Sequence, residues 1–245
     1  FFELMKNFLS ILFSLTLFAG CSSPDPLIWH QNYFIINDTA KEKNYAEIIY
    51  PLYTEGPNYD LINIRIDSLI RKHLVGDDPR FANITMKQVI DSFFSWKNRD
   101  SILNQIPYDL RSHCITKECG NVIALRGMVY RKTNDSSTNI DSYVYNIDRR
   151  NGRILTRDEI ISDTIRLKEL NQIYFSYYLI DRVISEETLF VPIDELPLPQ
   201  KISVDSTGIN MQYDPNEIAP LFIGEMQYYI PYDDAKPVLK KIVRK

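Results

Sequence analysis

Carboxylate pairs are the residues of this sequence whose types and spacing come closest to acid–base chemistry. They are Asp77-Asp78, Asp158-Glu159, Glu186-Glu187, Asp194-Glu195 and Asp233-Asp234. A glycosidase needs two carboxyl groups that face each other about 5 to 9.5 Å apart, whereas chain neighbours point in different directions from a helix or strand. Most of these pairs stand where a helix is expected to begin, and capping and the helix dipole favour acidic residues there. We therefore predict no catalytic residue among them.

Motifs for other kinds of catalysis or cofactor binding are also missing from the sequence. It contains no Gly-x-Ser-x-Gly nucleophile motif, no His-Glu-x-x-His zinc motif and no glycine-rich nucleotide loop. The net charge is -4, and Lys and Arg are scattered instead of forming the basic stripe that binds a phosphate backbone. We expect a non-enzymatic protein with no cofactor and no nucleic-acid partner.

Cys114 and Cys119, in the stretch HCITKEC, are the remaining candidates for covalent or metal chemistry. Outside the cytoplasm two thiols tend to be oxidised, and a disulfide across a small hairpin is the interpretation that we favour. The alternative is a metal site that includes His113. That set lacks a fourth ligand and has four residues between the cysteines instead of two, so we predict no metal.

The N-terminal segment predicts export. The apolar run from Phe8 to Phe18 has about eleven residues, whereas a membrane-spanning helix needs roughly twenty. Lys6 before the run and the small residues Ala19 and Gly20 after it complete the pattern of a cleaved signal peptide. We expect residues 1–20 to be removed.

The residues around the expected cleavage site resemble the lipobox of bacterial lipoproteins. The stretch Phe18-Ala19-Gly20-Cys21 carries this resemblance, although Phe18 stands where that family usually has Leu. The resemblance implies that Cys21 is the lipid attachment site, with fatty-acyl chains such as palmitate that anchor the protein in a membrane. The short tether after Cys21 has no acidic cluster, which favours a periplasm-facing location in a bacterial cell envelope.

Hydrophobic periodicity predicts the elements that follow. Helices are expected after Asn58, with apolar residues at helical spacing from Ile62 to Leu74, and from Thr85, where Gln88 completes a capping box. Strands are expected at 45–53, 122–131, 142–148, 202–204, 209–213 and 221–230, with a tight hairpin turn at Asn151-Gly152. Thr156 and Glu159 form another capping box, and further helices are expected at 164–181 and 234–243.

This order of elements predicts an α+β class, with a mostly antiparallel sheet covered by amphipathic helices. The expected organisation is a signal peptide (1–20), a tether and N-terminal strand (21–44), an N-terminal part (45–120) and a C-terminal part (121–245). Residues 45–245 are expected to form one compact unit.

Four tyrosines near the C-terminus are the candidate ligand surface. They are Tyr213, Tyr228, Tyr229 and Tyr232. Strand alternation places Tyr228 and Tyr229 on opposite faces, so at most about half of the four can face outward. Packing in the core is the interpretation that we favour over a ligand surface.

The C-terminal stretch INMQYDPNEIAPLFIGEMQYYIPYDDAKPVL (209–239) resembles domain-of-unknown-function family 3298 (DUF3298). NGRILTRDEII (151–161) resembles a turn-and-helix element of that family, and YPLYTEGPNYDLINIRID (50–67) more weakly resembles the partner family 4163. Two features depart from the family. The loop 131–142 lacks the usual Gly-Gly-Ala-His, and Asn216 stands where Tyr is usual.

The resemblance implies a function outside the cytoplasm, because these domains occur in envelope lipoproteins, in the sensor region of a lysozyme-responsive anti-sigma factor and beside certain peptidoglycan deacetylases. We expect a lipid-anchored protein that binds a macromolecule, either a protein or cell-wall glycan. Two alternatives stay open: a lysozyme-binding or lysozyme-inhibiting lipoprotein, and a hydrolase or deacetylase accessory that acts on peptidoglycan.

Overall fold

The structure is a computed structural model and describes residues 25–38, 44–76, 84–96, 109–132 and 138–244. The expected signal peptide, the expected lipid site Cys21 and the central part of the 131–142 loop lie outside the described residues. Among the helices that are described, none combines the length and the apolar character needed to cross a membrane.

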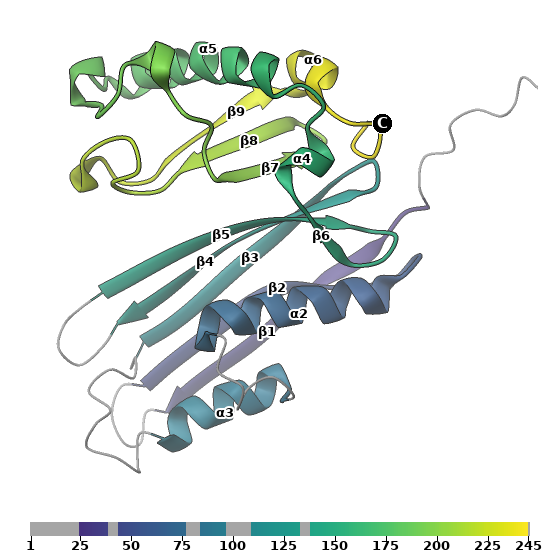
Figure 1. Ribbon diagram of the computed structural model, residues 1–245. Coiled ribbons are helices and arrows are strands. Elements are labelled where there is room, and N and C mark those ends of the chain that lie inside the picture. The colour runs from purple at the N-terminus through teal and green to yellow at the C-terminus, as the bar shows by residue number, and fades with distance from the viewer. Residues whose placement is uncertain (1–24, 39–43, 77–83, 97–108, 133–137, 245) are drawn as a thin grey trace, which may run out of the picture.

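The described chain forms four layers (Figure 1). Helix α5 (Thr164–Arg182) covers one face of a small three-stranded sheet, and the other face of that sheet lies on a large six-stranded sheet. Helices α2 (Tyr59–Val75) and α3 (Met86–Trp96) cover the far face of the large sheet. Two hydrophobic cores result, one under α5 and one under α2 and α3. The predicted α+β class is confirmed.

The strands of the large sheet lie side by side in chain order. They are β1 (Ile28–Asp38), β2 (Asn44–Glu55), β3 (Asp109–Cys119), β4 (Val122–Lys132), β5 (Thr138–Asp148) and β6 (Arg153–Leu155). All neighbours are antiparallel except β2 and β3, which are parallel. A parallel pair needs a crossover, and α2 and α3 lie within it.

Both crossover helices follow from local patterns. The predicted apolar stripe of α2 is buried from Ile62 to Leu74. Thr85 and Gln88 form the predicted capping box before α3: each backbone N–H donates to the other residue's side chain, at 2.8 and 3.3 Å. Asn58 differs from the prediction, because it adopts a left-handed conformation (φ 60°) and its side chain makes no capping hydrogen bond.

The small sheet consists of β7 (Lys201–Asp205), β8 (Gly208–Tyr213) and β9 (Met226–Pro231). Strand alternation sorts β8 into two kinds of residue. Ile209 and Met211 belong to the core under α5, whereas the amide side chains of Asn210 and Gln212 are buried on the other side of the strand. The small sheet therefore presents polar groups to the large sheet.

Short elements complete the upper half of the molecule. They are α4 (Arg157–Ile160), α6 (Tyr232–Ala235) and the 3₁₀ turns η2 (Glu186–Thr188), η3 (Ile193–Glu195), η4 (Leu221–Ile223) and η5 (Lys236–Val238). The predicted capping box of Thr156 and Glu159 starts α4. At the predicted Asn151-Gly152 hairpin, a longer turn joins Asp148 to Arg153, and only Gly152 of the two has a positive φ (68°).

The C-terminal prediction was wrong in two places. The expected strand 221–230 begins only at Met226, because Pro220 starts the 3₁₀ turn η4 and Gly224 ends it with φ 80°. The expected helix 234–243 is reduced to α6 and η5. Pro237, which has no backbone N–H to donate, stands at the start of η5 and limits the helix.

The predicted disulfide is not formed, and this prediction is corrected. Cys114 and Cys119 are both buried, and neither is in a disulfide. They lie five residues apart on the single strand β3, a separation of about 16 Å at 3.3 Å per residue, whereas a disulfide needs Cα atoms within about 7 Å. Cys114 belongs to the core under α2, and Cys119 belongs to the core under α5. His113 is exposed, so the alternative metal set is not assembled either.

Both thiols are expected to be unreactive in the folded protein. Burial raises the pKa of Cys114 to about 12, so the reactive thiolate is scarce at pH 8. A Cys21→Ala chain is expected to give no titratable thiol with a water-soluble disulfide reagent when native and two when unfolded in guanidinium without reductant. Finding none in guanidinium would restore the disulfide.

Candidate functional site

Polar side chains fill the space where the two sheets meet. On the small sheet Ser203, Asp205, Asn210 and Gln212 are buried, and on the large sheet Asn146 is buried. Asn146 of β5 joins the sheets directly: its side-chain amide donates to the carbonyl of Ile202 (2.7 Å) and accepts from the backbone N–H of Val204 (3.0 Å). Because a buried amide with both ends satisfied fixes one arrangement, Asn146 sets how β7 lies on β5.

Asp205 is the centre of the charges between the sheets. Its carboxylate is almost completely buried and accepts from Arg126 at 3.0 Å and from the backbone N–H of Thr207 at 2.8 Å. Lys117 approaches the same carboxylate at 3.8 Å and keeps 43% of its side chain exposed. Two cations thus share one carboxylate, and the exposed one stands at the rim of the space that opens next to it.

An inter-sheet cleft of about 300 Å³ opens beside this group. Strand β7 packs on β3, β4 and β5, whereas residues of β8 and β9 stand across the cleft from the large sheet. The large sheet contributes His113, Ile115, Lys117, Arg126, Met128 and Ser142 to the lining. The small sheet contributes Gln212 and Gln227, and Glu225, just before β9, completes that side. The cleft therefore mixes aliphatic side chains with amide, hydroxyl and charged groups.

The polar groups on the small-sheet side are held in place by one another. The Gln212 amide donates to the Ser142 hydroxyl (2.7 Å) and to the Glu225 carboxylate (2.9 Å). Gln227 donates to the Asn210 side chain at 3.0 Å. Side chains that are oriented before a ligand arrives lose less conformational entropy on binding. The cleft is thus preorganised for hydrogen bonding.

The same face of the large sheet continues beyond the cleft, and in the described part of the chain apolar side chains are exposed on it. We call it the open face and define it by Tyr33, Ile35, Ile115, Met128 and Ile140, which are 48 to 62% exposed. Strand pairing and one side-chain contact place these residues on one side of the sheet. Ile35 pairs with Glu47, and Met128 pairs with Ser142. Glu47 also contacts His113. Apolar side chains gathered on a surface mark an interaction site more often than scattered ones do.

Two polar groups cross the open face from strand to strand. The Tyr45 hydroxyl donates to Glu47, which also contacts His113. The Tyr45 hydrogen bond lowers the pKa of Glu47, so this residue stays a carboxylate well into acidic solution. In the next group Arg111 is held by Asp109 at 2.9 and 3.0 Å and lies over the rings of Tyr45 and Tyr130, at 5.0 and 5.9 Å from their centres.

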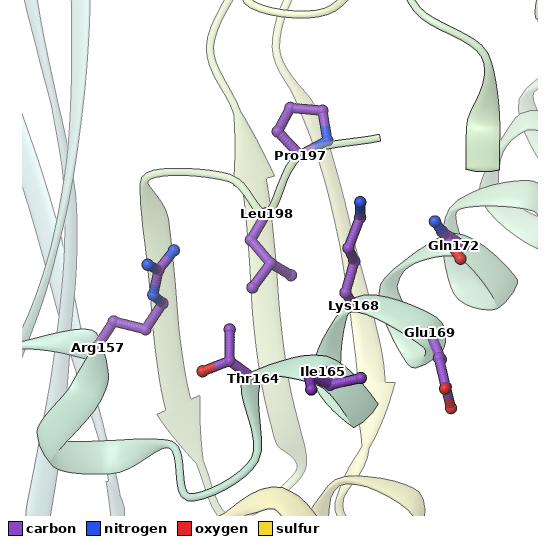
Figure 2. A pocket seen from close by; sticks show the side chains of 8 residues that line it. All are labelled: Arg157, Thr164, Ile165, Lys168, Glu169, Gln172, Pro197 and Leu198. Atoms are coloured by element: carbon purple, nitrogen blue, oxygen red, sulfur yellow. The ribbon is translucent and has the colours of Figure 1, made fainter. Parts of the chain in front are cut away.

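A second hollow, of about 520 Å³, lies beside the first half of α5 (Figure 2). Its lining includes Arg157, Thr164, Lys168, Glu169 and Leu198. Glu169 is already paired with Arg166 at 2.5 Å. The Gln172 amide donates to the backbone carbonyl of Asp194. This hollow is larger than the cleft, but its polar groups are mostly engaged with their own neighbours.

No protein-family model matches the sequence, and no curated protein matches it significantly. Two solved structures match the fold. A DUF3298 family member from Bacteroides fragilis superposes with a TM-score of 0.55 at 16% identity, over 89% of this chain and 95% of the other. A DUF3298 family protein from Pseudomonas aeruginosa superposes with a TM-score of 0.59 at 13% identity, over 91% of this chain and 99% of the other.

The chain has the fold of these DUF3298 proteins. The resemblance in the sequence is confirmed at the level of the fold. Both matches cover nearly the whole of their partner chains, so the fold includes the large sheet as well as the C-terminal part that carries the clearest motifs.

Within this DUF3298 fold, the four predicted surface tyrosines do not form one surface, and this prediction is corrected. Tyr213 and Tyr228 are buried under α5, where their rings pack against Phe175 and their hydroxyls contact Asn171. Tyr232 packs on the same core, and Tyr229 is half-buried with its hydroxyl 3.0 Å from that of Thr207. Core packing, the favoured interpretation, holds for Tyr213 and Tyr228.

The acidic pairs take structural positions where they are described. Glu159 completes the capping box, Asp233 and Asp234 lie in the first turn of α6, and the pairs at 186–187 and 194–195 belong to 3₁₀ turns. Asp77-Asp78 lies outside the described residues. In the described part of the chain, no three His, Cys, Asp or Glu side chains are grouped as metal ligands would be.

A histidine cluster around His73, near the end of α2, was missed by the sequence analysis. Its imidazole nitrogens face the Asp141 carboxylate (3.0 Å) and the Tyr145 hydroxyl (2.8 Å), and its ring stacks on Tyr143 at 4.1 Å. The partners stand 68 to 72 residues away in the chain, so no local pattern pointed to them. The cluster ties the end of α2 to β5.

Proposed function

We propose that this chain is a lipid-anchored, non-enzymatic binding protein of a bacterial cell envelope, and that its ligand is a strand of cell-wall glycan. The observation that carries the proposal is the continuity of the open face with the inter-sheet cleft. Ile115 and Met128 belong to both, so one extended ligand can contact apolar side chains and preorganised polar groups at once.

The chemistry of this surface suits a carbohydrate. Sugar rings offer hydroxyl and acetamido groups that both donate and accept, and the amides of Gln212 and Gln227 and the hydroxyl of Ser142 are groups of matching type. The rings of Tyr45 and Tyr130, with Arg111 between them, supply flat amphipathic contacts beside the cleft. Binding sites generally combine such apolar area with a few placed polar groups.

A basic protein such as lysozyme is the second candidate, because the chain carries a net charge of -4. The charges around the cleft do not favour it. They are the carboxylates Glu47, Asp109, Asp205 and Glu225 and the cations Arg111, Lys117 and Arg126. This local balance gives a strongly basic partner little attraction, so we place the glycan first.

The glycan proposal is tested by co-sedimentation of the purified full chain with insoluble peptidoglycan sacculi. We expect the wild type to sediment and the double variant Ile115→Ala/Gln227→Ala to bind about tenfold more weakly, a loss of about 1.4 kcal/mol. The matched control is Ile165→Ala at the second hollow, which is expected to bind like the wild type. A wild type that stays in the supernatant overturns the glycan, and retention on immobilised lysozyme would then favour the second candidate.

The anchor is tested separately, in membranes of the native host. The Cys21→Ala chain is expected to leave the membrane fraction, because the substitution removes the thiol that would carry the fatty-acyl chains. A Cys21→Ala chain that remains with the membranes would remove the lipid from the proposal without affecting the binding surface.

A further inference from the structure

Strand β1 is a long edge of the large sheet, and no other strand in the described part of the chain pairs with its outer side. It has 11 residues and pairs along its whole length with β2, which leaves its other side at the end of the strand order. An edge strand presents a row of unpaired backbone N–H and C=O groups, and these form a template for another strand.

Strand β1 carries few of the devices that usually protect an edge, and its one irregularity is a register shift against β2 between Ile28 and Trp29, at the start of the strand. Natural edges are short or carry Lys, Pro, Gly bulges or inward charges. The sequence IWHQNYFIIND contains no Lys, Arg, Glu, Pro or Gly, and its one carboxylate is the last residue, Asp38. The other edges are protected: β6 has three residues, β7 has five and begins with Lys201, and β9 has six and ends with Pro231.

Apolar side chains of β1 are also left in solvent. Ile28, Trp29, Tyr33 and Ile35 are 43 to 57% exposed. These residues have high strand propensity and lie on the edge instead of in a core. A partner strand would cover both the free backbone groups and part of this apolar area.

We propose that β1 pairs with β1 of a second copy of this chain, antiparallel and about a two-fold axis through Asn32. The two large sheets then form one continuous sheet. With the axis at Asn32, each residue of β1 pairs with one that lies an even number of positions away in the sequence. Such residues belong to the same face of the strand, so the open faces of both copies lie on the same side. This register places Trp29 opposite Ile35 of the second copy and Gln31 opposite Tyr33.

Charge and shape favour a second copy as the occupant. Between Trp29 and Ile35 the only titratable side chains are His30 and Tyr33. The proposed register places His30 opposite Phe34 and Tyr33 opposite Gln31. No like charges therefore meet in the interface. Trp29 and Ile35 form an aromatic–β-branched pair twice in the assembly, and such cross-strand pairs stabilise a sheet. Closed two-fold dimers are the commonest assemblies of identical chains. This proposal does not depend on the glycan.

The register is tested by cysteine cross-linking of the purified full chain. Residues opposite each other on antiparallel strands have Cα atoms about 4.5 to 5.5 Å apart, within disulfide range. On oxidation, Asn32→Cys is expected to give a covalent dimer at least tenfold faster than Tyr33→Cys, which lies off the axis, and Ile140→Cys, which lies on the open face away from the edge. Equal rates at the three positions, or no dimer from Asn32→Cys, overturns the register.

The interface itself is tested by the mass of the full chain in solution, measured by light scattering. We expect the wild type to have twice the monomer mass and the variant Gln31→Lys/Tyr33→Lys to dissociate at about tenfold higher concentration. The matched control, Ile115→Lys/Met128→Lys, adds the same charge to the open face and is expected to stay dimeric. A monomeric wild type, an unaffected edge variant, or equal dissociation of the control would each overturn the edge pairing. Failure to bind sacculi would leave these results unchanged.

Discussion

Asp205→Ala is expected to destabilise the protein by about 3 to 5 kcal/mol, among the largest effects of any single substitution. The substitution removes the carboxylate that Arg126 contacts at 3.0 Å, and the Arg126 side chain is only 14% exposed. A charge left buried without its partner costs far more than the pair contributes in net terms. The measurement is the midpoint of guanidinium unfolding, followed by circular dichroism, with the slope of the transition checked for two-state behaviour.

Two further variants separate the charge effect from a general loss of packing. Asp158→Ala removes a carboxylate whose side chain is 84% exposed, and we expect it to change stability by no more than about 0.5 kcal/mol. Asp205→Ala/Arg126→Met removes both charges, and we expect it to regain a large part of the loss. A double variant as unstable as Asp205→Ala would show that the ion pair is not what joins the sheets there.

The elements that the sequence predicted well are those with local causes. The apolar stripe from Ile62 to Leu74 in α2 and the capping box at Thr85 are each determined by residues that are close in sequence, and the structure contains both. The same holds for Thr156 and Glu159 before α4. Helix propensity, hydrophobic periodicity and capping act between residues about three to five positions apart, so these signals do not depend on residues far away in the sequence.

Strand β3 shows where a local argument misled. Its burial alternates from Leu110 to Thr116, which is the pattern of a long strand between two faces. The interpretation of Cys114 and Cys119 as a hairpin disulfide required a turn between them, and the oxidising environment expected for the protein favoured it. A straight strand instead carries the two thiols to different cores, a result that depends on the second sheet and not on the sequence near them.

The inter-sheet site could not be predicted, because its parts are distant in the chain. Arg126 and Asp205 are 79 residues apart, and Gln212 and Ser142 are 70 residues apart. In sequence, Asn210 and Gln212 alternate with apolar residues in the way of a strand with one face in solvent. Only the packing of β7 on β3, β4 and β5 turns that polar face into the wall of a cleft.

Asn171→Ala is expected to cost about 1 to 3 kcal/mol, because it leaves the buried Tyr228 hydroxyl without its acceptor. It also removes the donor to the Tyr213 hydroxyl, which keeps its hydrogen bond to the Pro197 carbonyl. Asn171 is fully buried on α5 and donates to the Tyr213 hydroxyl at 2.9 Å, while its oxygen accepts from the Tyr228 hydroxyl. Burial raises the pKa of Tyr213 to about 12, which agrees with a neutral phenol deep in the core. The expected result is a lower midpoint of guanidinium unfolding, with the slope unchanged.

A matched set of variants tests whether the hydrogen bonds or the lost volume cause this effect. Lys168→Ala on the exposed side of α5 is expected to be nearly neutral, because its side chain is in solvent. Asn171→Leu/Tyr228→Phe keeps the volume and removes both a hydroxyl and its acceptor, and we expect it to be more stable than Asn171→Leu alone, since replacing both partners avoids an unsatisfied group. If Tyr228→Phe brings no recovery, the pairing of Asn171 with Tyr228 does not carry the stability. The two C-terminal tyrosines would then contribute through ring packing against Phe175 alone.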